Sequence, residues 1–312
     1  MEGMRKCLLL LLLFCLVAVS GLSAAEKEVR YLTFSVKNRF DFFVRDLRLE
    51  EVELKIDGRP VDIGFLGSKD IDTAYVILLE NSPRTAKFPV SMPQHGRVNL
   101  IDQMRYQMSY NFFGPLVRSG SVLLGEFFRR VKILHDFSSR EDALVNALHN
   151  LSPNFNSIDM DSTRVGHALG RGVDLLKQRP EKRKVLVLFT ASIDRESYNH
   201  LDEYKDMLRL TDVELYAITS APRFAGGSQY TFQEKMSGYF LRQLAAETSG
   251  YAYVIKEFVY YDELFTDLVG RMTNTYTIGF YIYPGPEAES HKISLKINRE
   301  KCKVNCRKSL VF

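Results

Sequence analysis

AYVILLE, residues 74–80, is a continuous apolar run that ends in a carboxylate, and the polar turn NSPR follows at residues 81–84. A strand that is covered on both faces carries apolar residues at nearly every position, whereas a half-exposed strand alternates. The run therefore predicts a central strand of a sheet with helices on both faces. The turn sets Glu80, Ser82 and Arg84 close together at the end of that strand.

Similar apolar runs recur along the chain and alternate with amphipathic helical patterns. KVLVLFT at 184–190 and VELYAIT at 213–219 are two more such runs, and DSTRVGHALGRGVDLLKQ at 161–178 has helical periodicity. Strands that alternate with helices predict an α/β fold with a doubly wound, mostly parallel sheet. We expect this domain to span residues 73–275.

The two segments that flank this domain are strand-like. Residues 26–72 contain VRYLTFSV and VELKIDG, and residues 276–312 contain YTIGFYIY and KISLKI. Strands of this kind would leave an open sheet edge if either segment stood alone. We therefore expect the two segments to pack together as a subsidiary β unit beside the α/β domain.

The first 25 residues predict an export signal. Arg5 and Lys6 precede the apolar core CLLLLLLFCLVAV, and small residues follow in GLSAA. Because this pattern is typical of a cleaved signal peptide, we expect an exported protein, periplasmic or secreted, without a stable membrane span after cleavage. The alternative is an uncleaved anchor. Cys302 and Cys306 remain after cleavage, and we expect them to form a disulfide in an oxidising compartment.

The composition and the missing motifs argue against several function classes. A formal net charge of +4 over 312 residues favours no particular partner. The basic clusters EKRK and KCKVNCRK lack the interleaved aromatic residues of a nucleic-acid module. The chain has neither a G-x-x-x-x-G-K-[ST] phosphate loop nor a G-x-S-x-G nucleophile elbow, so Ser82 is a poor candidate for a nucleophile. We expect a non-enzymatic protein that binds a protein partner and no nucleic acid.

Three polar loops are predicted to meet at one edge of the sheet: ENSPR at 80–84, DMDSTR at 159–164 and TASIDRES at 190–197. In open parallel sheets, ligands bind at the carboxyl ends of the strands. The order of these loops resembles the von Willebrand factor type A domain, whose metal-ion-dependent adhesion site takes Asp-x-Ser-x-Ser, Thr and Asp from three loops. Stretches such as VLLGEFFRRVKILHDFSSREDALVNALHNL and LRQLAAETSGYAYVI make residues 30–312 similar to bacterial exported von Willebrand factor A-related proteins.

The resemblance implies a Rossmann-like core with a degenerate adhesion site. Ser82 and Thr163 match the family pattern, but Glu80 stands in place of the first Asp, Arg84 in place of the second Ser, and Ala191 in place of the last Asp. Magnesium prefers near-octahedral oxygen ligands at about 2.0–2.1 Å, and an arginine cannot become a ligand. The resemblance therefore implies a site without a metal cofactor.

Three interpretations of these departures are open. The one we favour is that the Arg84 guanidinium neutralises Glu80, and with it Asp194, in place of the ion. Alternatively, Asp161 and Asp194 rebuild a Mg²⁺ site of different geometry, or Glu80 and Arg84 serve only surface solubility.

The function that we expect is that of an exported, non-enzymatic adhesion or scaffold module. Its binding rim is expected to contain Glu80, Ser82, Arg84, Thr163 and Asp194, with the loop at 220–232 beside it. A metal-dependent adhesin with an altered site, or a hydrolase on a similar sheet, is the alternative.

Overall fold

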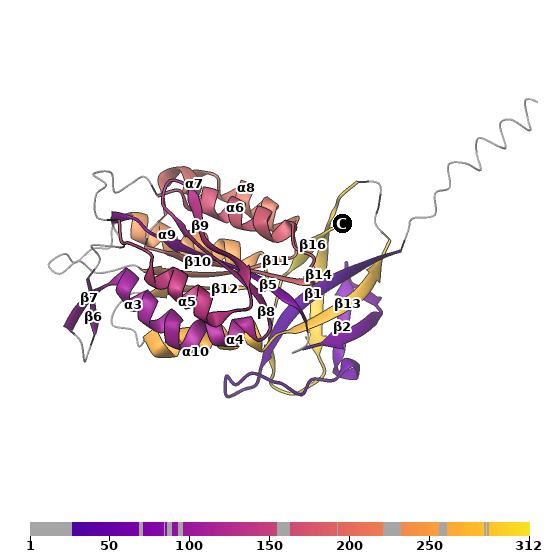
Figure 1. Ribbon diagram of the computed structural model, residues 1–312. Helices are drawn as coiled ribbons and strands as arrows, with labels where there is room; N and C mark the ends of the chain where they lie inside the picture. The colour runs from indigo at the N-terminus through magenta and orange to yellow at the C-terminus, as the bar shows by residue number, and fades with distance from the viewer. Residues whose placement is uncertain are drawn as a thin grey trace, which may run out of the picture.

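The computed structural model describes residues 27–68, 71–83, 85, 89–92, 96–154, 163–191, 193–220, 232–255, 261–283, 285 and 287–312. These residues form an α/β unit and, against one end of it, a β sandwich (Figure 1). Within the described part of the chain, no helix is long and apolar enough to cross a membrane.

A six-stranded sheet forms the centre of the α/β unit, in the order β12-β11-β10-β5-β8-β9. Its strands are β5 Thr73–Glu80, β8 Gly120–Phe127, β9 Val131–Ser138, β10 Arg183–Thr190, β11 Val213–Ser220 and β12 Tyr251–Ile255. Neighbouring strands are parallel except for the edge strand β9, which is antiparallel to β8. Numbered along the chain, this is the doubly wound order 3-2-1-4-5-6, in which the winding reverses between β5 and β10. The predicted fold class is confirmed.

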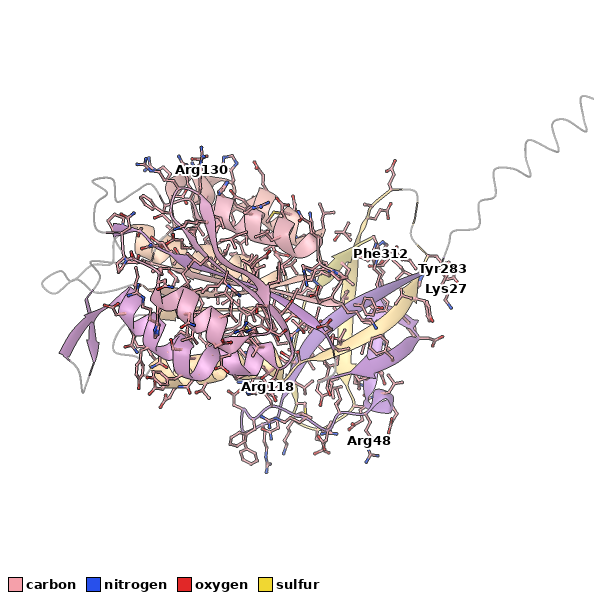
Figure 2. All side chains as sticks on the ribbon, viewed as in Figure 1. Lys27, Arg48, Arg118, Arg130, Tyr283 and Phe312 are labelled. Carbon is pink, nitrogen blue, oxygen red and sulfur yellow. The ribbon has the colours of Figure 1, made fainter. Side chains whose placement is uncertain are left out.

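Helices cover both faces of the sheet, as β5 illustrates, because every residue of β5 is buried. Tyr75, Ile77 and Leu79 pack in the cluster of the first helix layer, and Ala74, Val76 and Leu78 pack in that of the second. The first layer contains α3 Leu100–Gln107, the π-helical turn Met108–Phe112, α4 Phe113–Val117, α5 Glu141–His149 and α10 Tyr261–Thr273. The second contains α6 Val165–Lys177, α7 Arg195–Asn199, α8 Leu201–Arg209 and α9 Phe232–Ala246. Side chains fill the space between the sheet and both layers (Figure 2).

Both ends of the described chain contribute to the β sandwich. One sheet has the order β15-β1-β13-β4, and the other has the order β16-β14-β2-β3. The strands are β1 Glu28–Lys37, β2 Val52–Ile56, β3 Arg59–Val61, β4 Ile63–Gly67, β13 Tyr276–Ile282, β14 Ser290–Ile297, β15 Lys303–Cys306 and β16 Ser309–Val311. β1 pairs with β13, and β2 pairs with β14, so the subsidiary β unit that we predicted from the two ends is present. A 3-10 turn, Leu49–Glu51, precedes β2, and a separate hairpin joins β6 Pro89–Met92 to β7 Gly96–Asn99.

The expected disulfide is wrong for this structure, because Cys302 and Cys306 are free thiols. Cys306 ends β15, and Cys302 directly precedes that strand. A strand rises about 3.3 Å per residue, so Lys303 and Cys306 alone are roughly 10 Å apart, beyond the Cα separation of about 7 Å that a disulfide spans. A disulfide between cysteines four positions apart would need a tight turn here, but pairing with β1 extends the segment.

Arg307 fixes the sandwich to the α/β unit. Its buried guanidinium donates hydrogen bonds to the carbonyl oxygens of Thr211 at 2.6 Å, Leu208 at 3.0 Å and Glu247 at 3.3 Å. These carbonyls lie at the C-terminal ends of α8 and α9, where a cation is favoured. Burial lowers the pKa of Arg307 from its usual value. The side chain therefore joins the last strands of the chain to two helices of the α/β unit.

A buried ion pair joins β10 and β11 at the end of the sheet that faces the sandwich. Arg183 donates to both carboxylate oxygens of Glu214, at 2.7 and 2.8 Å, and also to the carbonyl of Met272. The two side chains are 5% and 3% exposed. Burial opposes the charge of Arg183, but the Glu214 carboxylate outweighs it, and the pKa of Arg183 is raised. Neither charge is solvated, so each depends on the other.

Candidate functional site

The candidate site lies where β5 and β10 end side by side. Glu80 is the last residue of β5, Thr190 is the last residue of β10, and Thr163 lies two residues before α6. β5 and β10 are the strands between which the winding of the sheet reverses, and loops diverge there and leave room for a ligand. The three loops that the sequence predicted to converge thus meet at this edge, as far as their residues are described.

Glu80 is at the centre of this site and is only 2% exposed. Its Oε1 accepts hydrogen bonds from Ser82 Oγ at 2.5 Å and from Thr163 Oγ1 at 3.0 Å. Its Oε2 accepts hydrogen bonds from Thr190 Oγ1 at 2.6 Å and from the backbone N–H of Ala191 at 2.7 Å. Four donors from three separate segments therefore surround one carboxylate.

These four bonds explain how a carboxylate can be buried here. Removing an ionised carboxylate from water is costly unless hydrogen bonds replace the lost solvation. Three hydroxyl groups and one amide occupy the acceptor positions of both oxygens of Glu80. Hydrogen bonds from three segments therefore hold both oxygens of Glu80 in place.

Thr85 holds the loop that carries Ser82. The Thr85 hydroxyl shares its one hydrogen between the carbonyl of Ser82, at 2.8 Å, and that of Glu80, at 3.2 Å, and it accepts from the Ser82 N–H at 3.0 Å. Ser82 is fully buried, and its hydroxyl is directed to Glu80. This geometry disfavours Ser82 as a nucleophile, because its oxygen is screened from solvent and its proton is bound by a carboxylate in the core.

Asn81 anchors the other side of the loop, and it was not among the predicted site residues. Its amide nitrogen donates to Glu126 Oε2 at 2.5 Å and to the carbonyl of Ser152 at 2.9 Å. Its amide oxygen accepts from the Asn154 N–H at 3.0 Å. A lone Asn in a polar turn is common, so no pattern distinguished it. Thr190 was also missed, although it begins the quoted loop TASIDRES.

Asp194 lies near the site but serves the helices. Its Oδ1 accepts from the Ser197 N–H at 2.9 Å, and its Oδ2 accepts from Ser197 Oγ at 2.6 Å and from the Val165 N–H at 3.0 Å. The Ser197 hydroxyl in turn accepts from the Gly166 N–H at 2.7 Å. Asp194 is thus the N-cap of α7 and also accepts from the first residue of α6. It therefore joins the N-terminal ends of α6 and α7.

Two of the residues on which the sequence-based interpretations depend, Arg84 and Asp161, lie outside the described residues. The predicted neutralisation of Glu80 by Arg84 and the alternative metal site with Asp161 therefore stay predictions. The structure adds that Glu80 already has four hydrogen-bond donors among the described residues.

Comparisons with known proteins find similarity in structure only. Neither a family model nor a curated protein sequence matches the chain. Among solved structures, the chain is similar to the conserved hypothetical protein BatB from Bacteroides thetaiotaomicron, at TM-score 0.48 and 10% identity over 64% of this chain and 97% of that one. It is also similar to the PilB minor pilin from Streptococcus sanguinis, at TM-score 0.49 and 12% identity over 66% and 62%.

A von Willebrand factor type A protein from Catenulispora acidiphila is similar over a longer stretch, 93% of this chain and 75% of that one, at TM-score 0.46 and 10% identity. Likenesses at this level carry no argument about function. The function proposed for this chain therefore rests on the strand order and the hydrogen bonds of Glu80 instead.

Proposed function

We propose that this chain is an exported protein-interaction module whose adhesion-type site is closed by its own Glu80 carboxylate and works without a metal ion. The observation that carries this proposal is the set of four hydrogen bonds that Glu80 accepts from Ser82, Thr163, Thr190 and Ala191. Export rests on the N-terminal sequence pattern and on the resemblance to exported proteins.

The chemistry of the donors supports a metal-free site. In the resembled family, the hydroxyls that correspond to Ser82 and Thr163 are expected to turn their lone pairs toward a cation. Here both hydroxyls donate to Glu80. At Ala191, where the resemblance expects a carboxylate, a backbone N–H points inward instead. A glutamate is one methylene longer than an aspartate, so its carboxylate reaches the point on which these donors converge. This donor set does not fit a magnesium ion, which needs oxygen lone pairs.

A partner that binds here would contact charged side chains around the buried Glu80 carboxylate. Arg164, Arg195 and Glu196 are exposed next to the buried Asp194 cap, and Arg164 forms an ion pair with Glu196. Recognition at such a rim depends on shape and on charged hydrogen bonds. The alternative function, a metal-dependent adhesin with an altered site, would use Asp161 together with Asp194.

Site-specific photo-crosslinking tests the proposal. A crosslinking amino acid replaces Arg195 at the rim or, as the control, Lys55 on β2 of the sandwich, and the protein is irradiated in its own envelope extract. We expect a discrete adduct from position 195, of equal yield with EDTA and with magnesium. Loss of that adduct in EDTA would favour the metal-dependent alternative. Adducts from position 55 but not from position 195 would overturn the assignment of the rim.

A further inference from the structure

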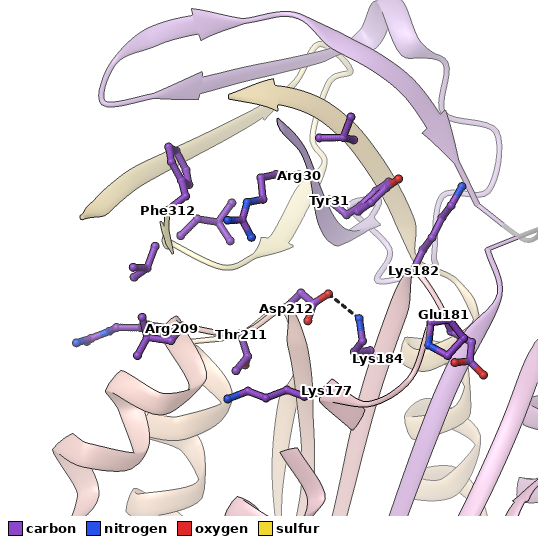
Figure 3. Close-up of a pocket in the computed structure, with 15 residues that line it drawn as sticks. Arg30, Tyr31, Lys177, Glu181, Lys182, Lys184, Arg209, Thr211, Asp212 and Phe312 are labelled. Carbon is purple, nitrogen blue, oxygen red and sulfur yellow. Dashed lines mark hydrogen bonds and ion pairs between the residues drawn. The ribbon is translucent and has the colours of Figure 1, made fainter. Parts of the chain in front are cut away.

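A groove of about 490 Å³ lies between the β sandwich and the α/β unit (Figure 3). It is lined by the first residues of β1, by β16, and by the turns that lead into β10 and β11. It is therefore at the opposite end of the central sheet from Glu80. A smaller pocket shares Tyr31, Lys182 and Asp212 with this groove and adds Thr33 and Ser249. The two cavities together follow β1 from Val29 to Thr33.

Along this groove, β1 has a strand partner on one side only. β1 pairs with β13 over Glu28–Phe34, but it pairs with β15 only over Phe34–Lys37. After Cys306 the chain turns away and continues as β16, which pairs with β14. Among the described residues, the first six positions of β1 therefore have no strand on the side of β15.

The hydrogen bonds show which backbone groups face the groove. The Val36 carbonyl accepts from the Val44 N–H at 2.9 Å, and Val44 must lie on the β13 side because β15 occupies the other side at Val36. Backbone groups alternate along an antiparallel strand. Even-numbered residues of β1 therefore face β13, and odd-numbered residues face the groove. Consistent with this, the Ser249 hydroxyl reaches across from the α/β unit to the Thr33 carbonyl. Val29 and Tyr31 present their N–H and C=O groups to the cavity.

The groove is positively charged. Five cationic and two acidic side chains line it, namely Arg30, Lys177, Lys182, Lys184 and Arg209, with Glu181 and Asp212. Both acids are engaged, since Glu181 binds Arg179 and Asp212 accepts from Lys184 at 3.0 Å. Lys177 and Lys182 both line the groove and are labelled in Figure 3, and neither forms an ion pair with a described residue. The Lys182 ammonium lies over the rings of Tyr31 and Phe65. Leu210, 62% exposed, adds an apolar surface.

We propose that an extended, acidic peptide segment of a partner protein binds this groove as an added strand on β1. Its backbone pairs with Val29 and Tyr31, whose groups repeat at the spacing of alternate strand residues, about 6.8 Å. Its carboxylates meet Lys177 and Lys182, and apolar side chains between them contact Leu210. The open strand edge distinguishes this ligand from a small anion, which would use the lysines alone. This site is separate from the Glu80 rim.

Peptide binding to the full chain tests the proposal. The probe is a fluorescent Glu-Val-Glu-Val-Glu-Val peptide, and its controls are a Lys-Val repeat and the acidic peptide with N-methylated backbone amides. We expect binding of the first peptide only. Lys177→Glu and Lys182→Glu should each weaken it by about tenfold or more, whereas Lys55→Glu, an equal charge change on the exposed face of β2, should leave it unchanged.

Amide hydrogen exchange gives a second readout that needs no variant. The peptide should slow exchange at Val29 and Tyr31, whereas Arg30 and Leu32, which face β13, should be protected with and without peptide. The proposal is overturned if the lysine repeat or the N-methylated peptide binds equally well, or if exchange at Val29 and Tyr31 does not change. Concentration-dependent dimerisation that protects these two amides without peptide would also overturn it, in favour of a second copy of this chain.

Discussion

Thr163 and Glu80 are separated by 83 positions in the chain, and the Thr163 hydroxyl donates a 3.0 Å hydrogen bond to Glu80 Oε1. This bond joins the segment that precedes α6 to the end of β5, across the point where the sheet reverses its winding. A carboxylate in this position organises the loops by accepting hydrogen bonds from them. The stability of the loop cluster should therefore depend on the hydrogen bonds that Glu80 accepts.

Replacing Glu80 by glutamine tests that dependence. In Glu80→Gln, the amide nitrogen cannot accept the two hydrogen bonds that one carboxylate oxygen now accepts, so two buried donors lose their partner. We expect the free energy of unfolding to fall by about 2–4 kcal/mol, measured by urea denaturation. Glu50→Gln, at an exposed position, is the control and should change stability by less than about 0.5 kcal/mol. Equal effects of the two changes would show that the Glu80 bonds contribute little.

Magnesium should not bind saturably to the unmodified protein at millimolar concentration. The triple variant Glu80→Asp, Arg84→Ser, Ala191→Asp restores the ligand set of the resembled family. It should show a melting temperature that rises with magnesium, because an ion that binds only the folded state stabilises it by mass action. Calorimetric titration and thermal melts of both proteins measure this. Saturable binding by the parent would contradict the metal-free site.

Separating Arg307 from the helix ends should weaken the junction of the two units. Arg307→Met leaves the carbonyls of Thr211, Leu208 and Glu247 without their donor. We expect a loss of about 2–4 kcal/mol in the free energy of unfolding, and faster amide exchange in β15 and β16. Arg59→Met, at an exposed position of β3, is the matched control. An unchanged exchange pattern in β15 and β16 would show that other contacts hold the sandwich in place.

Breaking the buried pair of Arg183 and Glu214 on one side should cost more than removing it entirely. Glu214→Gln leaves the Arg183 charge buried without a counterion, and we expect a loss of about 3–5 kcal/mol. The double change Arg183→Met, Glu214→Leu removes both charges and should recover most of that loss. Urea denaturation of the three proteins measures the difference. A double variant less stable than Glu214→Gln would show that the pair is a net stabilising interaction.

Cys306 should react slowly with alkylating reagents. Burial raises the pKa of its thiol to about 12, well above the usual value for a cysteine. The raised pKa means that stability from the neutral thiol is fully present below pH about 9 and is lost as the pH rises toward about 12. At pH 8 the reactive thiolate is therefore scarce in the folded protein. Mass spectrometry should find Cys306 unmodified by iodoacetamide in native buffer and two alkylated thiols in non-reducing denaturant. One disulfide instead would restore the original prediction.

The sequence predicted the fold better than it predicted the site. The apolar runs at 74–80 and 184–190 were sufficient to place both central strands, because a strand buried on both faces needs apolar residues at nearly every position. The hydrogen bonds of Glu80 depend on how far one side chain extends and on hydroxyls from distant segments, and no local pattern encodes either. The Cys302–Cys306 prediction failed for a related reason: β15 is extended because it pairs with β1, more than 260 positions earlier in the chain.

The pairing of β1 with β13 has a consequence for the order in which the chain folds. The Thr33 and Thr277 hydroxyls, 244 positions apart, are 3.3 Å from each other across these two strands. Closing such a long loop costs conformational entropy before any contact repays it, so strands of this separation form late. The crossovers between β5, β8 and β10 are shorter, and we expect the α/β unit to collapse first. β1 is synthesised early, but it can pair with β13 only after residues 276–282 have been synthesised.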